Sequence, residues 1–463
     1  MERYDLIVVG SGPAGRRAAI QAAKLGRSVL VIENRLRVGG VSVHTGTIPS
    51  KTLRETVLNL SGWRERGFYG LAYRVKKDIE GKDLGVRLRK TLDHEIEVLE
   101  HQFARNGVRT FAGFARFADP HRLTVKTTAE EYTVAGDKII IAVGTAPFRP
   151  QGIPFNNRNV FDSDNIATEP HVPRSLTVVG AGVIGIEYAT IFSALDVPVT
   201  IVEPRQDFLE FIDREIIDEF LHDLRKRGIQ FRLGVKVERV ELDDQGYALS
   251  FLSDGRRVRT EALLYAAGRV GATSDLGLEK CGIEADRRGR LEVDRKTFQT
   301  KVPHIYAAGD VIGFPSLAST SMEQGRTAAC HAFGAPMPAA PEHFPYGIYA
   351  VPEISTVGLT ELQARESGFG YEVGIARFRE ISRGHIMGLE SGMMKLLFAL
   401  SDRKLLGAHI VGEGATELIH IGQAVLNLGG TIDYFVENAF NYPTLAEGYK
   451  IAALDAYNRM GPR

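Results

Sequence analysis

Residues 5–15 read Asp-Leu-Ile-Val-Val-Gly-Ser-Gly-Pro-Ala-Gly, and they decide the fold of the 463-residue chain. The aliphatic first half has the unbroken apolar character of a strand buried on both faces of a parallel sheet. A glycine turn follows, then a helical pattern over residues 16–25, and then an aliphatic strand over residues 28–32 that ends at Glu33. This order of strand, glycine turn, helix, strand and acid predicts the first βαβ unit of a Rossmann-like α/β fold.

The glycines of this turn suit a bound dinucleotide. Gly10 permits the tight turn, Gly12 lets the main chain approach a pyrophosphate, and Gly15 lets the helix pack closely on the strand. Amide groups and the helix dipole favour phosphate at the start of the helix, and Glu33 can accept hydrogen bonds from both ribose hydroxyls. The candidate residues of this first site are Gly10, Gly12, Pro13, Ala14, Gly15 and Glu33.

The same unit recurs further along the chain. An aliphatic strand over residues 175–179 precedes Gly-Ala-Gly-Val-Ile-Gly, then come a helix through Leu195, a strand over residues 197–202 and Glu203. The interval from the first glycine to the acid is the same in both copies, which chance rarely produces. We therefore expect two bound dinucleotides, the second one at Gly180, Gly182, Val183, Ile184, Gly185 and Glu203.

The end of the second unit bears on the choice of coenzyme. Glu203 can accept hydrogen bonds from the ribose diol of NAD and repels a 2′-phosphate. Arg205 follows, and its guanidinium could pair with that phosphate, although a solvated loop arginine is an equally good interpretation. Together the two residues predict a site that favours NAD and tolerates NADP.

Composition excludes several classes of function. The formal net charge is +0, so no basic surplus predicts binding to nucleic acid or to an anionic membrane. No apolar run approaches transmembrane length, and a strand begins almost at the first residue, which predicts no signal peptide. The two cysteines, Cys281 and Cys330, are too few for a disulfide framework and suit a reducing cytoplasm.

Residues 39–51, Gly-Gly-Val-Ser-Val-His-Thr-Gly-Thr-Ile-Pro-Ser-Lys, resemble the redox-active loop of the flavoprotein disulfide reductases, such as lipoamide dehydrogenase, glutathione reductase and mercuric reductase. In that family two cysteines, separated by four residues, stand between Gly-Gly and Ile-Pro-Ser-Lys. Here Ser42 and Thr47 occupy the two positions. A hydroxyl group cannot replace a thiolate in disulfide exchange. The resemblance therefore implies the family scaffold without its dithiol relay.

A second motif near the end of the chain has changed in the same sense. Residues 440–447 read Phe-Asn-Tyr-Pro-Thr-Leu-Ala-Glu, where the family has His-Pro-Thr and a glutamate five residues after the histidine. In the family that histidine services the cysteine pair as acid and base across the dimer. Tyr442 takes its place and Glu447 remains. A tyrosine, with an ordinary pKa of about 10, is a poor base near neutral pH.

The resemblance assigns roles to further residues. It implies that Lys51, expected to open the helix after the loop, and Glu187 form an ion pair beside the flavin N5, with a purely structural bridge between domains as the alternative. Asp310 of Gly309-Asp310 is implied to bind the ribityl chain of FAD. The remaining implied contacts with FAD are Gly40, Val41, Gly144, Leu317 and Ala318, and Gly268 is implied for the nicotinamide coenzyme.

The full-length resemblance is to the soluble, Si-specific pyridine nucleotide transhydrogenases, in residues 46–51, 309–313 and 440–444. It implies one FAD per subunit, NAD(H) and NADP(H) as substrates, no metal and no membrane or nucleic-acid partner. It also implies a cytoplasmic homodimer, or a larger homo-oligomer, that transfers hydride reversibly from NADPH to NAD+ through the flavin. The alternatives are an NAD(P)H-dependent flavin reductase acting on quinones or other oxidants, and a non-catalytic nucleotide-binding homologue.

These motifs predict two Rossmann-like dinucleotide-binding domains and a C-terminal α+β dimerisation domain. The expected parts are an FAD domain in two segments (1–149 and 270–336), an NAD(P) domain (150–269) and an interface domain (337–463), with an alanine- and proline-rich linker at 335–345. A long amphipathic helix is expected over residues 84–105 and a buried strand over residues 138–143. His420, in a helix expected over residues 416–428, is expected to be packed rather than catalytic.

Overall fold

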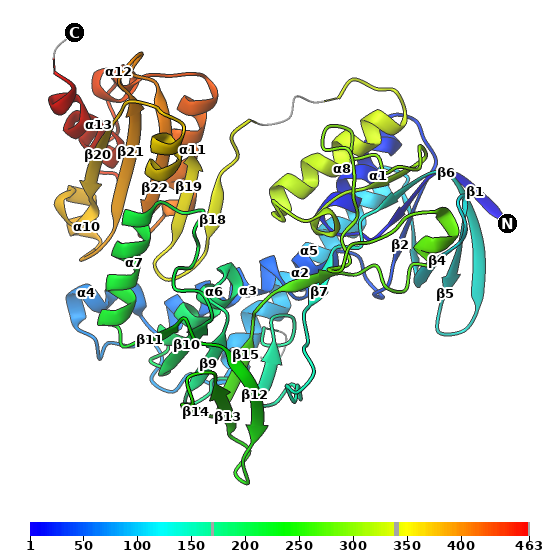
Figure 1. Cartoon of the computed structure of the whole chain (residues 1–463), viewed down its shortest axis with the longest axis horizontal. Helices are drawn as coiled ribbons and strands as arrows, with labels where there is room; N and C mark the ends of the chain where they lie inside the picture. The colour runs from blue at the N-terminus through cyan, green and yellow to red at the C-terminus, as the bar shows by residue number, and fades with distance from the viewer. Residues whose placement is uncertain (168–170, 338–341, 462–463) are drawn as a thin grey trace.

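The computed structural model describes residues 1–167, 171–337 and 342–461. It forms three packed parts (Figure 1): one around the N-terminus, one at the lower centre containing the second glycine turn, and one that ends the chain. Among the described residues no helix is both long and apolar enough to cross a lipid bilayer.

The first sheet has seven strands in the order β3-β2-β1-β6-β5-β4, with β17 beside β6. Its strands are β1 (Glu2–Val9), β2 (Val29–Glu33), β3 (Arg109–Ala112), β4 (Phe114–Asp119), β5 (Arg122–Lys126), β6 (Glu131–Ile141) and β17 (Ile305–Ala307). β1, β2, β3, β6 and β17 run parallel, while β4 and β5 form an antiparallel extension. Because β17 returns from far along the sequence, this sheet is discontinuous in the chain.

The pairing register places the C-terminal ends of these parallel strands side by side. Val9 pairs with Ile32 on one side and with Ile141 on the other, and Ile141 pairs with Ala307. The residues that follow each strand therefore emerge at one edge of the sheet, which is where α/β folds bind ligands. α1 (Pro13–Lys24) and α8 (Ala318–Ala332) pack together on one face of the sheet (Figure 1).

The second part repeats this arrangement with a five-stranded parallel sheet of order β11-β10-β9-β15-β8. Its elements are β8 (Val160–Asp162), β9 (Leu176–Val179), α6 (Val183–Ser193), β10 (Val199–Glu203), α7 (Arg214–Lys226), β11 (Gln230–Leu233) and β15 (Ala262–Tyr265). An antiparallel sheet of β12 (Val237–Leu242), β13 (Ala248–Leu252) and β14 (Arg257–Thr260) precedes β15. The pair β7 (Thr145–Pro147) and β16 (Arg269–Gly271) leads into and out of this part.

The C-terminal part is an antiparallel sheet of order β18-β19-β22-β21-β20 with helices against it (Figure 1). Its strands are β18 (Tyr346–Ile348), β19 (Ile354–Gly358), β20 (Tyr371–Arg377), β21 (Met393–Ala399) and β22 (Leu405–Val411). Its helices are α9 (Glu361–Glu366), α10 (Ser382–Ile386), α11 (Ala415–Asn427), α12 (Ile432–Glu437) and α13 (Glu447–Met460). Phe378, Phe435 and Tyr449 are fully buried in its core.

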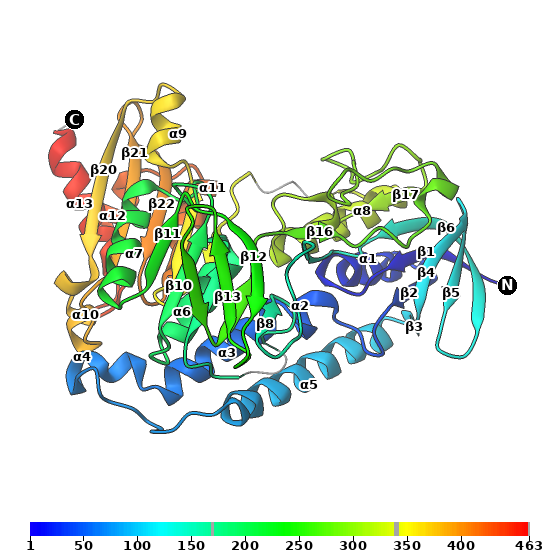
Figure 2. The same cartoon turned by 60° about the horizontal axis from the view of Figure 1, so that its bottom comes forward.

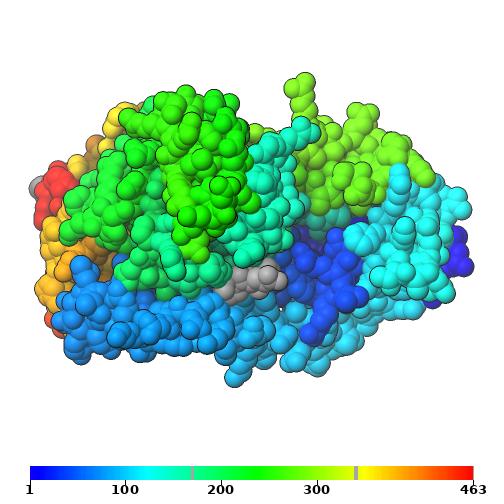
Figure 3. Space-filling model, turned by 90° about the horizontal axis from the view of Figure 1, so that it is seen from below, coloured from blue at the N-terminus to red at the C-terminus, as the bar shows by residue number. Residues whose placement is uncertain are grey.

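Helices from the N-terminal region run beneath the other two parts (Figure 2). They are α2 (Gly40–His44), α3 (Thr47–Leu60), α4 (Arg66–Tyr69) and α5 (Gly81–Arg105). In the space-filling view this segment forms a band along one edge of the second part (Figure 3). Short 3₁₀ turns complete the fold: η1 (Trp63–Glu65), η2 (Leu278–Cys281), η3 (Asp310–Ile312) and η4 (Phe378–Glu380).

Several boundaries differ from the sequence-based expectation. The helix expected to open at Lys51 begins at Thr47, because Pro49 lies in its first turn, where a missing N–H breaks no hydrogen bond. The long helix begins at Gly81, where Glu80 and Asp83 form a capping box. β6 begins at Glu131 rather than at residue 138, because pairing with β5 extends the strand.

Candidate functional site

The first glycine turn is too crowded for any side chain at two of its positions. Gly10 has a φ of +103°, and a Cβ built on it would lie 2.4 Å from the oxygen of Ala142. A Cβ on Gly15 would lie 1.9 Å from the oxygen of Gly10. Gly12, which caps α1, has no heavy atom within 4 Å of such a Cβ. The turn is thus tightly packed at Gly10 and Gly15 and open at Gly12, as a pyrophosphate at a helix N-terminus requires.

The second turn repeats these features. Gly180 has a φ of +102°, and a Cβ on Gly185 would lie 2.0 Å from the oxygen of Gly180. Gly182 caps α6 and again faces open space. Pro13, Ala14, Val183 and Ile184 form the first turns of the two helices. Both turns therefore have the shape that fits a dinucleotide phosphate group.

The two acids end their strands in matching surroundings. Glu33 is buried and accepts hydrogen bonds from the amide and hydroxyl of Ser11. Glu203 is also buried and accepts one from the amide of Ala181 at 2.7 Å. Burial opposes the ionisation of Glu203, but hydrogen bonds from Arg205 and Ala181 hold its pKa below the usual value. Both acids can therefore act as acceptors for a ribose.

Arg205 does not stand free, as the sequence alone suggested it could. Its Nε donates to Oε1 of Glu203 at 2.7 Å, and its amide donates to the same oxygen at 3.2 Å. About half of the Arg205 side chain is exposed. Pairing with a 2′-phosphate would therefore require the guanidinium to leave Glu203.

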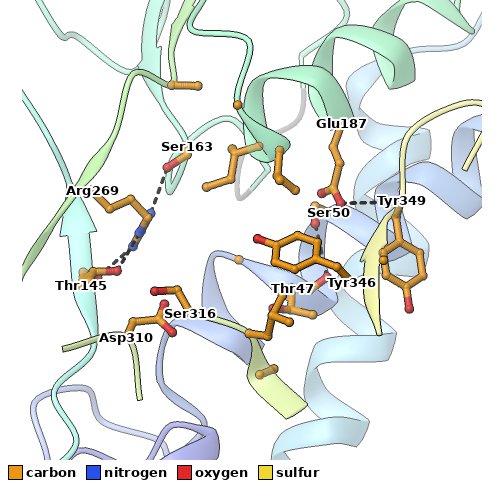
Figure 4. Close-up of a pocket in the computed structure, with 18 of the residues that line it drawn as sticks. Thr47, Ser50, Thr145, Ser163, Glu187, Arg269, Asp310, Ser316, Tyr346 and Tyr349 are labelled. Carbon is orange, nitrogen blue, oxygen red and sulfur yellow. Dashed lines mark hydrogen bonds between the residues drawn. The ribbon is translucent and has the colours of Figure 1, made fainter. Parts of the chain in front are cut away.

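A cavity of about 1170 Å³ joins the second glycine turn to residues from all three parts of the chain (Figure 4). α3 contributes Thr47, Ser50 and Lys51, and α6 contributes Glu187. The C-terminal part contributes Tyr346 and Tyr349. The candidate residues that line the cavity are Val41, Thr47, Lys51, Gly180, Gly182, Val183, Ile184, Glu187, Glu203, Arg205, Gly268, Asp310, Leu317 and Ala318.

Lys51 and Glu187 form the predicted ion pair. The ammonium of Lys51 lies 2.9 and 2.7 Å from the two carboxylate oxygens of Glu187. The amide of Tyr349 donates to the same carboxylate at 2.9 Å, and the Lys51 ammonium lies 4.9 Å from the centre of the Tyr349 ring. Both residues line the cavity, but the Glu187 side chain is 5% exposed and that of Lys51 26% exposed, so the lysine is the more accessible partner.

The remaining candidates lie around these groups. Gly40 packs on the first turn, since a Cβ there would lie 2.7 Å from Cα of Gly12. Gly144 precedes β7, and Gly268 precedes β16. The amide of Gly309 donates to Oε1 of Gln324 at 2.9 Å. Asp310, the first residue of η3, faces the cavity (Figure 4); burial raises its pKa, which the nearby charge of Arg269 opposes.

The positions that carry thiol chemistry in the family hold other groups here. Ser42 Oγ donates to the carbonyl of Gly39 at 3.1 Å, and Thr47 is exposed to the cavity. Cys281 and Cys330 are both buried and unpaired, and burial raises the pKa of both thiols. A raised pKa lowers the thiolate fraction near neutral pH and hence reactivity.

Tyr442 and Glu447 lie apart from the cavity within the described chain. Tyr442 is 65% exposed, and its hydroxyl lies 2.8 Å from Oγ of Ser382. Oε2 of Glu447 is buried and has no hydrogen-bond partner among the described residues. In a single chain these two residues therefore do not meet Lys51 and Glu187.

His420 is not packed, which corrects the sequence-based expectation. It lies on α11 with its side chain exposed, its Nδ1 2.9 Å from Oε1 of Gln423, and both residues line the cavity. The helical periodicity that places a histidine on α11 does not tell whether its face meets a core or a cavity.

Sequence reasoning also missed Arg269 as a site residue. Its guanidinium donates to Thr145 and, at 3.0 Å, to Ser163 (Figure 4), and it also donates to Asp164 at 2.7 Å. The arginine thereby fixes the junction between β7, β16 and the second sheet. Its place directly after Gly268, at the start of β16, was the available signal.

Comparisons with known proteins cover almost the whole chain. Residues 4–325 match the family described as pyridine nucleotide-disulphide oxidoreductase, and residues 344–453 match the dimerisation domain of that family. A soluble pyridine nucleotide transhydrogenase of Mycobacterium bovis (strain BCG / Pasteur 1173P2) is 50% identical over 99% of this chain and 98% of its own. A protein of the same name from Hahella chejuensis is 42% identical, with 99% of each chain covered.

Solved structures give the same result for the fold. LpdA from Mycobacterium tuberculosis superposes with a TM-score of 0.89 at 25% identity and 100% coverage of both chains. The HOCl-induced flavoprotein disulfide reductase RclA from Escherichia coli superposes with a TM-score of 0.87 at 27% identity, covering 97% of this chain and 99% of its own.

The geometry of the ion pair generates a stability prediction. Lys51→Met should lower the free energy of unfolding by roughly 3 kcal/mol, the lower end expected when a buried carboxylate loses its partner, because Lys51 is partly exposed. Lys51→Met combined with Glu187→Gln should recover most of that loss, since no buried charge remains. Urea unfolding of these two variants, of Glu187→Gln alone and of the wild type gives the coupling. Additive losses would show that the two residues act independently.

Proposed function

The chain belongs to the pyridine nucleotide-disulphide oxidoreductase family, and we propose that it is an FAD-dependent, soluble cytoplasmic transhydrogenase of the Si-specific type. It transfers hydride reversibly between NADPH and NAD+ without a redox-active disulfide. The observation that carries the proposal is the cavity that joins the second glycine turn to Lys51, Glu187 and Asp310, with no cysteine in its described lining.

The residues divide the binding work between two sites. The first glycine turn and Glu33 would hold the adenosine and pyrophosphate of FAD, and Asp310 would accept hydrogen bonds from its ribityl hydroxyls. The second glycine turn and Glu203 would hold a nicotinamide coenzyme. When bound, FAD supplies a ring that takes hydride from one coenzyme and returns it to the other. Because one cavity serves both coenzymes, they must occupy it in turn.

The chain itself supplies charge and orientation. Lys51, fixed by Glu187, presents a positive charge to the cavity, and such a charge stabilises negative charge that develops during reduction. The amide of Tyr349 holds the carboxylate in place, so the lysine is aimed before any ligand binds. Ser42 and Thr47 offer no thiolate, and the exposed Tyr442 offers no base near neutral pH. Reducing equivalents would therefore leave by the route through which they entered.

The direct test is transfer between coenzymes. The purified protein should carry about one FAD per chain and reduce an NAD+ analogue with NADPH by ping-pong kinetics. Prior alkylation of thiols should leave the rate intact, and two-electron reduction should bleach the flavin without a thiolate charge-transfer band. Light scattering on the same sample should give the mass of a homodimer, because residues 344–453 match a dimerisation domain.

Parallel assays on that sample can overturn the proposal. Robust turnover of lipoamide would contradict the interpretation of Ser42 and Thr47. Quinone turnover far above coenzyme turnover would favour a flavin reductase, and folded protein that cannot be loaded with FAD would exclude both enzymes.

Lys51 provides a second prediction. Lys51→Met should slow flavin reduction by NADH and by NADPH alike, because the charge acts where electrons arrive rather than on the adenosine. FAD content should not change. Stopped-flow reduction of the variant and of Lys51→Met with Glu187→Gln separates this effect from folding, since both lack the ammonium but only one leaves a buried charge. Wild-type rates in the folded double variant would leave Lys51 a structural role only.

Glu203 and Arg205 provide a third prediction, which concerns the choice of coenzyme. Glu203→Ala should weaken NAD+ binding, and Arg205→Ala should weaken NADP+ more than NAD+. Losing a charged hydrogen bond lowers affinity about tenfold or more. Calorimetric titration of the oxidised holoenzyme of each variant measures its affinity for NAD+ and for NADP+. An equal effect of Arg205→Ala on the two coenzymes would show that Arg205 only pairs with Glu203 and does not bind the 2′-phosphate.

A further inference from the structure

A tight turn at residues 286–290 carries two arginines, Arg288 and Arg290, into the lining of the cavity. Oδ1 of Asp286 accepts hydrogen bonds from the amide of Arg288 at 2.7 Å and from that of Arg290 at 2.8 Å. These backbone hydrogen bonds hold the pKa of Asp286 below its usual value. The carboxylate therefore stays ionised near neutral pH and fixes the turn from within.

The turn is also anchored to the rest of the protein. The amide of Gly271 donates to the carbonyl of Arg288 at 2.7 Å, and the hydroxyl of Thr273 donates to the carbonyl of Gly289 at 2.9 Å. Gly289 has a φ of +71°, and a Cβ on it would lie 2.5 Å from the oxygen of Gly271, so the turn and β16 are in close contact. A turn held in this way presents its side chains from a fixed base.

Arg290 runs along the chain that follows Asp310. Its Cδ would lie 3.3 Å from a Cβ on Gly313, which directly follows η3. The two arginines therefore belong to the side of the cavity formed by residues 269–316. The second glycine turn and α6 belong to a different part of the chain. The cavity that borders the second glycine turn is thus also lined by two guanidinium groups from a separate part of the chain.

Charge pairing singles these arginines out. The other cations of the cavity have carboxylate partners, since Lys51 pairs with Glu187, Arg205 with Glu203 and Arg269 with Asp164. Within the part of the chain that the structure describes, the guanidinium groups of Arg288 and Arg290 have neither an ion pair nor a hydrogen bond. The nearby Asp286 carboxylate attracts both charges but forms no salt bridge with either guanidinium among the described residues, so both groups remain open to a bound anion.

We propose that Arg288 and Arg290 bind the pyrophosphate of the nicotinamide coenzyme. The N-terminus of α6 offers this group amides and a partial charge of about half a unit, whereas the pyrophosphate diester carries two negative charges. Two planar guanidinium groups match both the charge and the oxygen geometry of phosphate. Arg205 is held by Glu203 at the other end of the coenzyme site. The inference rests on the proposed function only in that a nicotinamide coenzyme enters the cavity.

The test uses oxidised holoenzyme and probes that undergo no redox reaction. Arg288→Ala, Arg290→Ala and the double variant are titrated calorimetrically with ADP-ribose, which has the pyrophosphate but no nicotinamide, and with adenosine 2′-monophosphate, which lacks the pyrophosphate. Each single change should weaken ADP-ribose binding about three- to tenfold, and the double change should weaken it further. Binding of adenosine 2′-monophosphate should not change. Raising the ionic strength should weaken ADP-ribose binding less in the double variant than in the wild type.

Arg287→Ala is the matched control, because Arg287 lies in the same turn, is exposed and does not line the described cavity. It removes the same charge and should leave ADP-ribose binding unchanged. An equal loss in Arg287→Ala would overturn the proposal by showing that only overall charge matters. Unchanged ADP-ribose affinity in the double variant, or a loss confined to adenosine 2′-monophosphate, would overturn it too. Loss of FAD from the variants would assign the arginines to FAD instead.

The outcome does not depend on transhydrogenation. If the protein reduced quinones rather than NAD+, the ADP-ribose titrations would still report on Arg288 and Arg290. Conversely, active transfer between coenzymes with normal ADP-ribose binding in the double variant would remove the inference and keep the proposed function.

Discussion

The structure depends on a buried carboxylate and the groups that compensate its charge. Glu187 lies on α6 with 5% of its side chain exposed, and such a group is tolerated only when it is paired and hydrogen-bonded. Lys51 reaches it from α3, and the amide of Tyr349 reaches it from the C-terminal part. One carboxylate therefore holds three separate regions of the chain together. The cavity lies where these regions converge on Glu187.

The contacts around Glu187 do not involve the two positions at which the family carries cysteines. Ser42 and Thr47 lie in α2 and at the start of α3, and neither takes part in the contacts around Glu187. The glycine turns depend on close backbone approaches at Gly10, Gly15, Gly180 and Gly185, which are independent of the loop. The residues at positions 42 and 47 therefore have no part in the contacts that form the cavity around Glu187.

The positively charged side chains of the cavity differ in whether they have a carboxylate partner. Most of its cations are already paired with carboxylates, so they position elements and limit the net field. Arg288 and Arg290 are the exception, and their turn is fixed by Asp286 and β16 rather than by a ligand. The backbone of this turn is fixed before an anion binds, so only the two arginine side chains would lose freedom on binding.

Much of this molecule was readable from local sequence. The glycine spacings, the acids at the strand ends and the aliphatic strands predicted both βαβ units, because each signal is confined to a short stretch whose backbone geometry only glycine or a buried aliphatic run satisfies. The resemblance carried by residues 39–51 and 440–447 led to the family, and the matches over residues 4–325 and 344–453 confirmed it. The pairing of Lys51 with Glu187 was likewise implied before the structure showed it.

What only the tertiary structure decided concerns groups that meet from distant segments. The exposure of His420, the junction at Arg269 and the unpaired guanidinium groups of Arg288 and Arg290 all depend on which elements pack against one another. The periodicity of a helix tells on which face a residue lies, but it does not tell which other segment packs against that face. The sequence by itself thus determined the dinucleotide folds, because their constraints are local, whereas the environment of each charge was set by contacts between segments far apart in the chain.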